Sequence, residues 1–483
     1  MKKRVVLVIV AILSMLTVCA FGLSACGEQS KFEFRLNDDG NSYTVVKFYD
    51  AKNTTKEVEI PSKYKGLPVT SIGWGAFRNC KSLTSVTIPD SVTSIGGYAF
   101  SGCSSLTSIT IPDSVTRIGD DAFAYCKSLT SVTIPDSVTS IENSAFSGCS
   151  SLTSITIPDS VTSIENSAFS DCSSLTSITI PDSVTSIGGY AFYVCRSLTS
   201  ITIPDSVTSI EDNAFSGCSS LTSVTIGNSV TSIGEYAFSG CVRLVEVINK
   251  SSLNITKRSK DYGWVGYYAL TVHNGESKIV NKDGYLFITG DDGLNYLIDY
   301  IGNETELTLP ETYNGENYEI YKYAFRNCKS LTSVTIPDSV TSIGYDAFSG
   351  CSSLTSVTIP DSVTSIGANA FYDCSSLKSV TIGNSVTSIR GYAFAYCKSL
   401  TSVTIPDSVT SIGGYAFYVC RSLTSITIPD SVTSIGGYAF YDCSSLKDVT
   451  FTGTKAQWNS ISKGAGWALF AGYYTVHCTD GDI

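Results

Sequence analysis

The chain has 483 residues, of which only 16% are charged, whereas about 25% is typical of soluble proteins. Its 43 acidic and 32 basic residues give a formal net charge of −11, which argues against a nucleic-acid partner because such binding needs a basic surface. The hydrophobic fraction of 43% excludes wholesale disorder. Two histidines in the whole chain argue against a multi-histidine metal site.

The first residues have the pattern of an export signal. Three basic residues at 2–4 precede an apolar stretch over 5–18, and small residues lead to Cys26. This pattern resembles a bacterial lipoprotein signal, and the resemblance implies cleavage before Cys26 and lipid attachment to it. An ordinary secretory signal cleaved nearby is the alternative, and both export the protein. Since no later apolar run is long enough to span a bilayer, we expect a lipid-anchored protein on the extracellular face of the cell membrane.

Most of the chain is a repeat of 23 residues, marked by a recurring cysteine. The cysteines of the two series are Cys80, Cys103, Cys126, Cys149, Cys172, Cys195, Cys218 and Cys241, then Cys328, Cys351, Cys374, Cys397, Cys420 and Cys443. Seven complete units run over 83–243 and five over 331–445. A fixed period of 20–29 residues with leucine and isoleucine at set offsets is typical of a leucine-rich repeat solenoid.

The unit over 106–128 shows how one repeat would fold. Leu106, Ile109 and Ile111 alternate with small polar residues, which predicts a short strand with one buried face. The Pro-Asp-Ser segment over 112–114 predicts a turn, and apolar residues over 115–126 form a second wall. One unit cannot bury these faces alone, so we predict that copies stack into a solenoid with short parallel β-strands.

The pattern IP-x-x-V-x-x-IG-x-x-AF-x-x-C-x-x-L, which covers most of 58–450, resembles the BspA-like leucine-rich repeat family of bacterial surface proteins. The resemblance implies a curved or superhelical solenoid, extracellular display, and adhesion to host proteins or other bacteria. Periodicity predicts the solenoid by itself, whereas adhesion follows only from the resemblance.

The repeats form two arrays, because the gap between the two cysteine series is not a multiple of 23. Asp-Asp-Gly segments at 38–40 and 291–293 predict hairpin caps before each array, and the similar segments 266–273 and 472–477 predict caps after each. We predict two arrays with β-rich caps; one continuous solenoid with a bulky insertion is the alternative. The predicted segments are the signal 1–25, an N-terminal cap 26–82, array 1 over 83–243, a cap and linker 244–284, a second N-terminal-type cap 285–330, array 2 over 331–445, and a C-terminal cap 446–483.

The sequence predicts no catalytic site. No GxSxG, HExxH or Walker motif accompanies the abundant serines and aspartates, and His273 and His477 occupy equivalent cap positions that duplication explains. We assign the aspartate after each strand, such as Asp113, to turn formation rather than to calcium, because each unit supplies one carboxylate and two units lack it. We therefore expect no enzyme activity, no metal and no cofactor.

The repeat cysteines are predicted to be buried thiols, because each follows the core phenylalanine by three residues and all point the same way. Disulfides between neighbouring turns are the alternative, which an oxidising compartment would favour. Cys478 lies outside the repeat pattern and is a candidate free thiol.

Comparison of the repeats with one another locates a candidate binding surface, because the residues flanking Ala-Phe vary while strands and turns do not. We call the tyrosines at these positions the tyrosine strip: Tyr98, Tyr190, Tyr236, Tyr392, Tyr415 and Tyr438 before Ala-Phe, and Tyr193, Tyr372, Tyr418 and Tyr441 after it. Tyrosine supplies a large contact area and a polar tip at low entropic cost. The alternative is that these rings only cover the apolar rim of each turn.

The outward strand positions, such as Ser108 and Thr110, predict a uniform hydroxyl face that makes the protein soluble without charge. The alternative is that this regular hydroxyl face binds a repetitive ligand, such as a glycan, a filament or ice. Taken together, the sequence favours multivalent binding of an extracellular protein or glycan, with a structural spacer in the cell envelope as the other candidate function.

Overall fold

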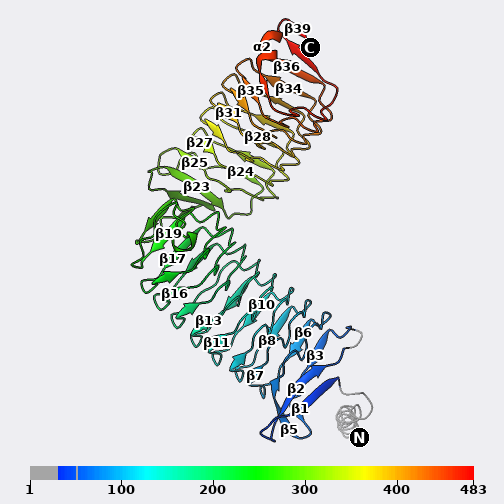
Figure 1. Ribbon diagram of the computed structural model, residues 1–483, viewed down its shortest axis with the longest axis vertical. Helices are drawn as coiled ribbons and strands as arrows, with labels where there is room; N and C mark the ends of the chain where they lie inside the picture. The colour runs from blue at the N-terminus through cyan, green and yellow to red at the C-terminus, as the bar shows by residue number, and fades with distance from the viewer. Residues whose placement is uncertain (1–30, 51–52) are drawn as a thin grey trace, which may run out of the picture. The chain divides into compact units, whose positions relative to one another are not determined.

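The computed structural model describes residues 31–50 and 53–483, so the predicted signal and Cys26 lie outside the described residues. The chain divides into two compact units, Met1–Gly275 and Glu276–Ile483, and each has its own hydrophobic core. Within each unit, the short strands of successive repeats pair side by side into sheets (Figure 1). The predicted solenoid of short parallel strands is therefore confirmed.

Eleven of the twelve complete repeats contain two strands rather than the single strand expected. In the repeat that begins at Leu106, strand β8 (Ser108–Thr110) is followed by β9 (Arg117–Ile118). The turn between them is closed by a hydrogen bond from the Val115 N–H to the Pro112 carbonyl, 2.9 Å. The second strand has only two residues, which is too short for an alternating pattern to reveal; stacking on its neighbours makes it a strand.

The described residues of the first unit form four sheets. The first has the order β1 (Phe32–Leu36), β2 (Tyr43–Phe48), β5 (Leu67–Ile72), β7 (Ser94–Ile95), β9, with β4 (Lys63–Tyr64) paired to β5. The second is β12 (Ser154–Thr156), β10 (Ser131–Thr133), β8, β6 (Ser85–Thr87), β3 (Glu57–Glu59). The third is β11 (Ser140–Ile141), β13 (Ser163–Ile164), β14 (Ser186–Ile187), β16 (Ser209–Ile210), β18 (Ser232–Ile233), and the fourth is β15 (Ser200–Thr202), β17 (Ser223–Ile226), β19 (Glu246–Asn249), β20 (Thr271–His273).

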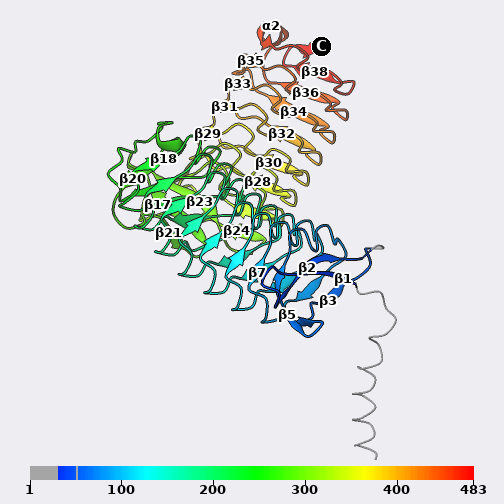
Figure 2. The same ribbon diagram turned by 60° about the horizontal axis from the view of Figure 1, so that its bottom comes forward.

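The second unit contains two longer sheets, which run along two sides of the stack (Figure 2). One is β21 (Val280–Lys282), β22 (Tyr285–Thr289), β23 (Asn295–Tyr300), β25 (Tyr318–Ile320), β27 (Val340–Ile343), β29 (Ser365–Ile366), β31 (Ser388–Ile389), β33 (Ser411–Ile412), β35 (Ser434–Ile435), β37 (Ser462–Lys463). The other is β24 (Glu306–Thr308), β26 (Ser333–Thr335), β28 (Ser356–Thr358), β30 (Ser379–Thr381), β32 (Ser402–Thr404), β34 (Ser425–Ile428), β36 (Asp448–Phe451), β38 (Thr475–Cys478), β39 (Gly481–Asp482).

Antiparallel hairpins begin both stacks. Strands β1 and β2 are joined through Gly40 (φ 65°), and β22 and β23 through Gly293 (φ 79°), so both glycines supply the left-handed conformation that the Asp-Asp-Gly segments indicated. At the other ends, β20 pairs with β19 and β38 with β36. The two ends differ locally: a 3₁₀ turn, η1 (Tyr262–Trp264), precedes β20, whereas helix α2 (Lys455–Ser460) precedes β38.

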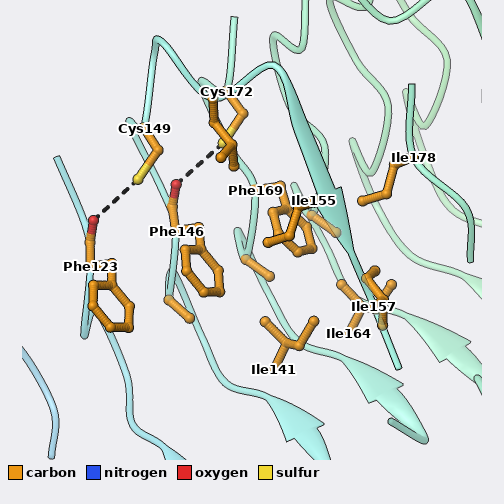
Figure 3. Packing of buried hydrophobic residues seen from close by; sticks show 14 of the residues in the cluster. Phe123, Ile141, Phe146, Cys149, Ile155, Ile157, Ile164, Phe169, Cys172 and Ile178 are labelled. Carbon is orange, nitrogen blue, oxygen red and sulfur yellow. Dashed lines mark hydrogen bonds between the residues drawn. The ribbon is translucent and has the colours of Figure 1, made fainter. Parts of the chain in front are cut away.

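A column of stacked phenylalanines forms the centre of each core. In the first unit, neighbouring ring centroids from Phe77 to Phe238 lie 5.0–5.7 Å apart, and in the second, from Phe325 to Phe440, they lie 4.8–5.5 Å apart. Figure 3 shows Phe123, Phe146 and Phe169 side by side, with isoleucines across from them. Because each ring meets only its neighbours one repeat away, the core extends with every added repeat.

Candidate binding surface

The variable residues lie on the loop that follows the short strand, where the backbone is held by hydrogen bonds between repeats. The Tyr98 N–H donates to the Asp120 carbonyl of the next repeat (2.8 Å), and the Phe100 N–H donates to the Ala122 carbonyl (2.7 Å). In all twelve complete repeats the residue before Ala-Phe has positive φ, for example 56° at Tyr98 and 58° at Tyr392. The loop conformation is thus common to every repeat, and only the side chains differ.

Tyrosine is an unfavourable choice at this position of the backbone. The left-handed region costs a non-glycine residue of this kind about 1 kcal/mol, and Asn and Asp tolerate it best. Six repeats carry small polar residues there, namely Asp121, Ser144, Ser167, Asn213, Asp346 and Asn369. Backbone preference therefore does not explain the six tyrosines before Ala-Phe.

In the second unit the strip becomes a continuous cluster of rings. Tyr392 stacks on Tyr415 with centroids 4.6 Å apart and planes 2° apart, and Tyr415 stacks on Tyr438 at 5.2 Å. A parallel row follows from Tyr418 to Tyr441 at 5.0 Å. We call the full set the tyrosine cluster: Tyr372, Tyr392, Tyr396, Tyr415, Tyr418, Tyr438 and Tyr441.

In the first unit the strip residues are not brought together. Tyr190 and Tyr193 form one edge-to-face pair at 5.4 Å. Tyr98 lies beside Trp74, and Tyr236 lies beside Trp264, near opposite ends of the array. The small polar residues of the intervening repeats separate these three groups.

Several exposed aromatic residues of this surface fall outside the sequence prediction. Tyr125 and Tyr396 precede a repeat cysteine, a third variable position with positive φ that comparison of the repeats could have identified. Tyr396 joins Tyr372 to Tyr418, with centroids 5.3 Å from each. Phe470, 65% exposed, packs edge-on against Tyr441 and belongs to the cap, where no repeat pattern could indicate it.

The rings of the tyrosine strip are partly exposed to solvent. Tyr392, Tyr190 and Tyr236 are 37%, 45% and 48% exposed, and the other seven are half-buried against their neighbours. Partial burial raises the pKa of Tyr392 and Tyr396, and a hydrogen bond to Asp121 raises the pKa of Tyr98. These three phenols are therefore neutral hydrogen-bond donors at physiological pH, which suits contact with a polar ligand.

Twelve of the fourteen repeat cysteines donate a hydrogen bond to a backbone carbonyl of the preceding repeat, and the described cysteines form no disulfide. Cys149 donates its S–H to the Phe123 carbonyl (3.2 Å), as Cys172 does to Phe146 (3.3 Å), and Figure 3 shows both contacts. Thirteen of the fourteen are buried; Cys328 is partly exposed, which differs from the expected uniform core position. Burial raises the pKa of Cys149 to about 12, so this thiol is not a nucleophile.

The two histidines form equivalent contacts in the two caps. The Nε2 atom of His273 lies 3.2 Å from Glu246, and that of His477 lies 3.2 Å from Asp448. His477 also contacts Asp482 through Nδ1 at 2.9 Å, and these hydrogen bonds raise its pKa. Each imidazole ties the last parallel strand to the strand before it.

The carboxylates of the turns contact the backbone between repeats. Where the next repeat reads Gly-Asn, Asp205 accepts from the Asn228 N–H at 2.8 Å, and Asp361 accepts from the Asn384 N–H at 2.7 Å. Within 31–50 and 53–483 no group of three or more His, Cys, Asp and Glu side chains is arranged to hold a metal ion.

The hydroxyl face of the strands is exposed as expected, with Ser108 and Thr110 outward and Ile109 inward. It contains one irregularity in the first unit: residues 177–179 have the common Ser-Ile-Thr sequence but form no strand, and the ladder stops between β12 and β15. A shallow cavity of about 680 Å³ lies there, lined by polar residues that include Asp182, Asp205 and Lys250.

In the part of the chain that the structure describes, no helix is long and apolar enough to cross a bilayer. Fold and surface together define a leucine-rich repeat solenoid that presents tyrosines from successive turns. The family described as BspA type Leucine rich repeat region (6 copies) matches residues 46–176, 139–260 and 318–447. These ranges cover more than half of the chain, so the protein belongs to this family and the resemblance stated from the sequence is confirmed.

Solved structures of bacterial repeat proteins are similar to this chain. A leucine rich cell surface protein from Faecalibacterium prausnitzii A2-165 is 32% identical, over 90% of this chain and 97% of that one, with a TM-score of 0.37. A leucine-rich repeat protein from Bacteroides ovatus ATCC 8483 is 27% identical, over 93% and 99%, with a TM-score of 0.41. The T. pallidum Leucine Rich Repeat protein is 31% identical, over 45% and 90%, with a TM-score of 0.35. Among curated proteins, none matches this chain.

Proposed function

We propose that this protein is a lipid-anchored bacterial cell-surface protein that binds an extracellular protein or glycan through its tyrosines, without catalysis, metal or cofactor. One observation carries the proposal: tyrosines occupy left-handed positions that other repeats fill with Asn, Asp or Ser. A residue kept where the backbone disfavours it, and left partly exposed, indicates a role at the surface.

The tyrosine cluster of the second unit is the main candidate for the contact surface. Its rings are held against one another, so little side-chain entropy is lost when a ligand covers them. Phe470, which is 65% exposed and packs edge-on against Tyr441, extends this apolar surface into the cap. Repeated rings present several similar contacts to one long ligand, which raises avidity without a strong single site.

The test uses substitutions that the fold already accepts at the same position. Tyr392, Tyr415 and Tyr438 are replaced together by Asn, because Asn213 and Asn369 occupy the equivalent left-handed position with φ 57°. Binding of the full chain to immobilised matrix proteins, mucin and bacterial cells should fall at least tenfold. The control replaces exposed strand residues Thr358, Thr381 and Thr404 by Ser and should leave binding unchanged.

The spacer function is tested by changing length alone. Residues 129–174 comprise two complete repeats and contain no tyrosine, so their deletion shortens the first array without touching the strip. A binding protein should keep its affinity after this deletion, whereas a spacer should lose function in proportion to length. Unchanged binding by the triple Asn variant together with loss in the deletion would reject the tyrosine surface in favour of the spacer.

The anchor is tested separately by replacing Cys26 with Ser. We expect this variant to lose fatty-acid labelling and to be released from the membrane fraction or to stay unprocessed, because two acyl chains provide the stable attachment. Membrane retention that does not change would refute the lipid anchor while leaving the binding proposal intact.

A further inference from the structure

A cavity of about 420 Å³ lies on the loop side of the first unit, near the start of the array. Its lining combines three cations with two tyrosines: Arg78, Lys81, Lys127, Tyr98 and Tyr125. All of these residues come from three successive turns, so the site belongs wholly to the first unit. Its volume is in the range of pockets that hold small ligands.

The cavity is positively charged in an acidic protein. Against Arg78, Lys81 and Lys127 it contains one carboxylate, Asp121, which a hydrogen bond ties to Tyr98. In the described part of the chain, none of the three cations forms an ion pair with a carboxylate. These charges therefore remain available to an anionic group.

Aromatic rings fix the position of the arginine. The guanidinium carbon of Arg78 lies 5.0 Å from the ring centroid of Tyr98 and 5.8 Å from that of Trp74. Contact with ring faces orients the planar guanidinium and leaves its N–H groups able to bind a planar or tetrahedral anion.

The second tyrosine is also held in place. Tyr125 has φ 59° and is 54% exposed, so it occupies an unfavourable conformation and still presents much of its ring to solvent. A Cβ at Gly148 of the next repeat would lie 2.6 Å from the ring, so glycine makes room for it. Tyr98 and Tyr125 thus provide aromatic surface beside the cationic groups.

The second unit contains a natural comparison for this site. The segment Ala76–Ser82 is repeated without change at Ala324–Ser330, so Arg326 and Lys329 correspond to Arg78 and Lys81. The surrounding residues differ, with the following counterparts: Trp74 with Lys322, Tyr98 with Asp346, Tyr125 with Asp373, and Lys127 with Ser375. There the guanidinium of Arg326 also lies over a ring, that of Tyr323 at 5.2 Å, but it faces a carboxylate, with Nε 4.0 Å from Asp346. The aromatic and cationic character therefore depends on residues specific to the first unit.

We propose that this cavity binds an acidic sugar of an extracellular glycan, a residue carrying a carboxylate or a sulfate ester. The anionic group pairs with Arg78 and Lys81 through charge-assisted hydrogen bonds, and the C–H face of the sugar ring lies on the tyrosines. This site goes beyond the proposed function, because it does not involve the tyrosine cluster of the second unit; it shares only Tyr98 with the strip.

The test measures binding of defined oligosaccharides to the full chain by calorimetry. A heparin tetrasaccharide and a hyaluronan tetrasaccharide separate sulfate from carboxylate recognition, and neutral chitotetraose controls for ring contact alone. We expect at least one acidic probe to bind, more weakly as salt concentration rises, and chitotetraose not to bind. Equal binding of chitotetraose, or of a glutamate-rich peptide, overturns the assignment to an acidic sugar.

Two variants assign the binding to this cavity. Arg78→Gln should weaken binding of the acidic probe about tenfold or more, since charge-assisted hydrogen bonds are lost. The combined change Tyr98→Asp, Tyr125→Asp and Lys127→Ser recreates three of the four differing residues of the second unit. It should abolish binding and still fold, because Asp346 and Asp373 have the same left-handed backbone (φ 54° each).

The matched control is Arg326→Gln, which alters the identical segment of the second unit and should leave binding unchanged. Failure of both acidic probes to bind, or equal loss in the Arg326 and Arg78 variants, overturns the proposal. The triple Asn variant of the tyrosine cluster should retain acidic-sugar binding, so failure of this site and failure of the proposed function give different results.

Discussion

Replacing Phe146 with alanine tests whether the stacked phenylalanine column stabilises one unit independently of the other. Phe146 is completely buried, and its ring lies between Phe123 at 5.3 Å and Phe169 at 5.7 Å, with planes 5° from each. Truncation of a buried phenylalanine to alanine costs about 3–5 kcal/mol, which includes the cavity left behind. We expect the upper part of this range, because two stacked neighbours lose contact at once.

The effect should remain within the first unit, because the two hydrophobic cores share no residue. Hydrogen exchange with mass spectrometry during urea unfolding can follow peptides of 83–243 and 331–445 separately. The first set should lose about 3–5 kcal/mol of unfolding free energy, and the second should change by less than about 0.5 kcal/mol.

The matched variant is Phe394→Ala in the second unit, where the ring is equally buried between neighbours at 5.4 and 5.5 Å. This variant should lower the unfolding free energy reported by peptides of 331–445 and leave that of 83–243 unchanged. Equal shifts of both peptide sets in either variant, or a loss below about 1 kcal/mol in the altered unit, would refute the assignment of independent stacked cores.

Three further predictions concern single groups. Iodoacetamide at pH 8 should not label Cys149 in the native chain but should label it in urea, because burial raises its pKa to about 12; native labelling read by mass spectrometry would contradict the buried thiol. Gly472→Ala should destabilise the second unit by about 1–3 kcal/mol and lower its thermal midpoint, because the new Cβ would lie 2.3 Å from the Leu446 carbonyl oxygen. An unchanged midpoint would show that the cap backbone shifts without cost to make room for the methyl group. Since its hydrogen bond to Asp482 raises the pKa of His477, the protonated imidazole stabilises the cap below about pH 6.5 and this contribution disappears as pH rises through the raised value. In an NMR titration, Asp482→Asn should move the His477 midpoint back toward about 6.5, and no movement would reject the contact.

The candidate surface shows where analysis of the repeats succeeds and where it stops. Variation before and after Ala-Phe identified ten tyrosines, and the structure groups six of them into one cluster, in which Tyr396 joins Tyr372 to the other five. It leaves Tyr98, Tyr190 and Tyr236 apart from one another. Grouping depends on which side chains occupy the neighbouring repeats, since Tyr190, with Ser167 and Asn213 at the same position of its neighbours, has no ring there to stack on.

The pocket of the first unit shows the same limit. Arg78 and Arg326 lie in identical seven-residue segments, yet one contacts two aromatic rings and the other faces a carboxylate. The seven residues alone cannot distinguish them, because the deciding residues are Trp74, two positions before the segment, and Tyr98, Tyr125 and Lys127 of the next two turns. Comparison of positions one repeat apart would have found the difference, although only the structure shows that they meet.

The sequence by itself determined that this protein is a leucine-rich repeat solenoid, because a 23-residue period with one apolar face per unit can be buried only by stacking. It also indicated the hairpins that begin both stacks, since Asp-Gly turns are local chemistry. The tertiary structure alone decided the second strand of each repeat, the contacts of the cysteine thiols and the grouping of rings and charges. These features join residues about one repeat apart, and such residues become neighbours only when the turns are stacked.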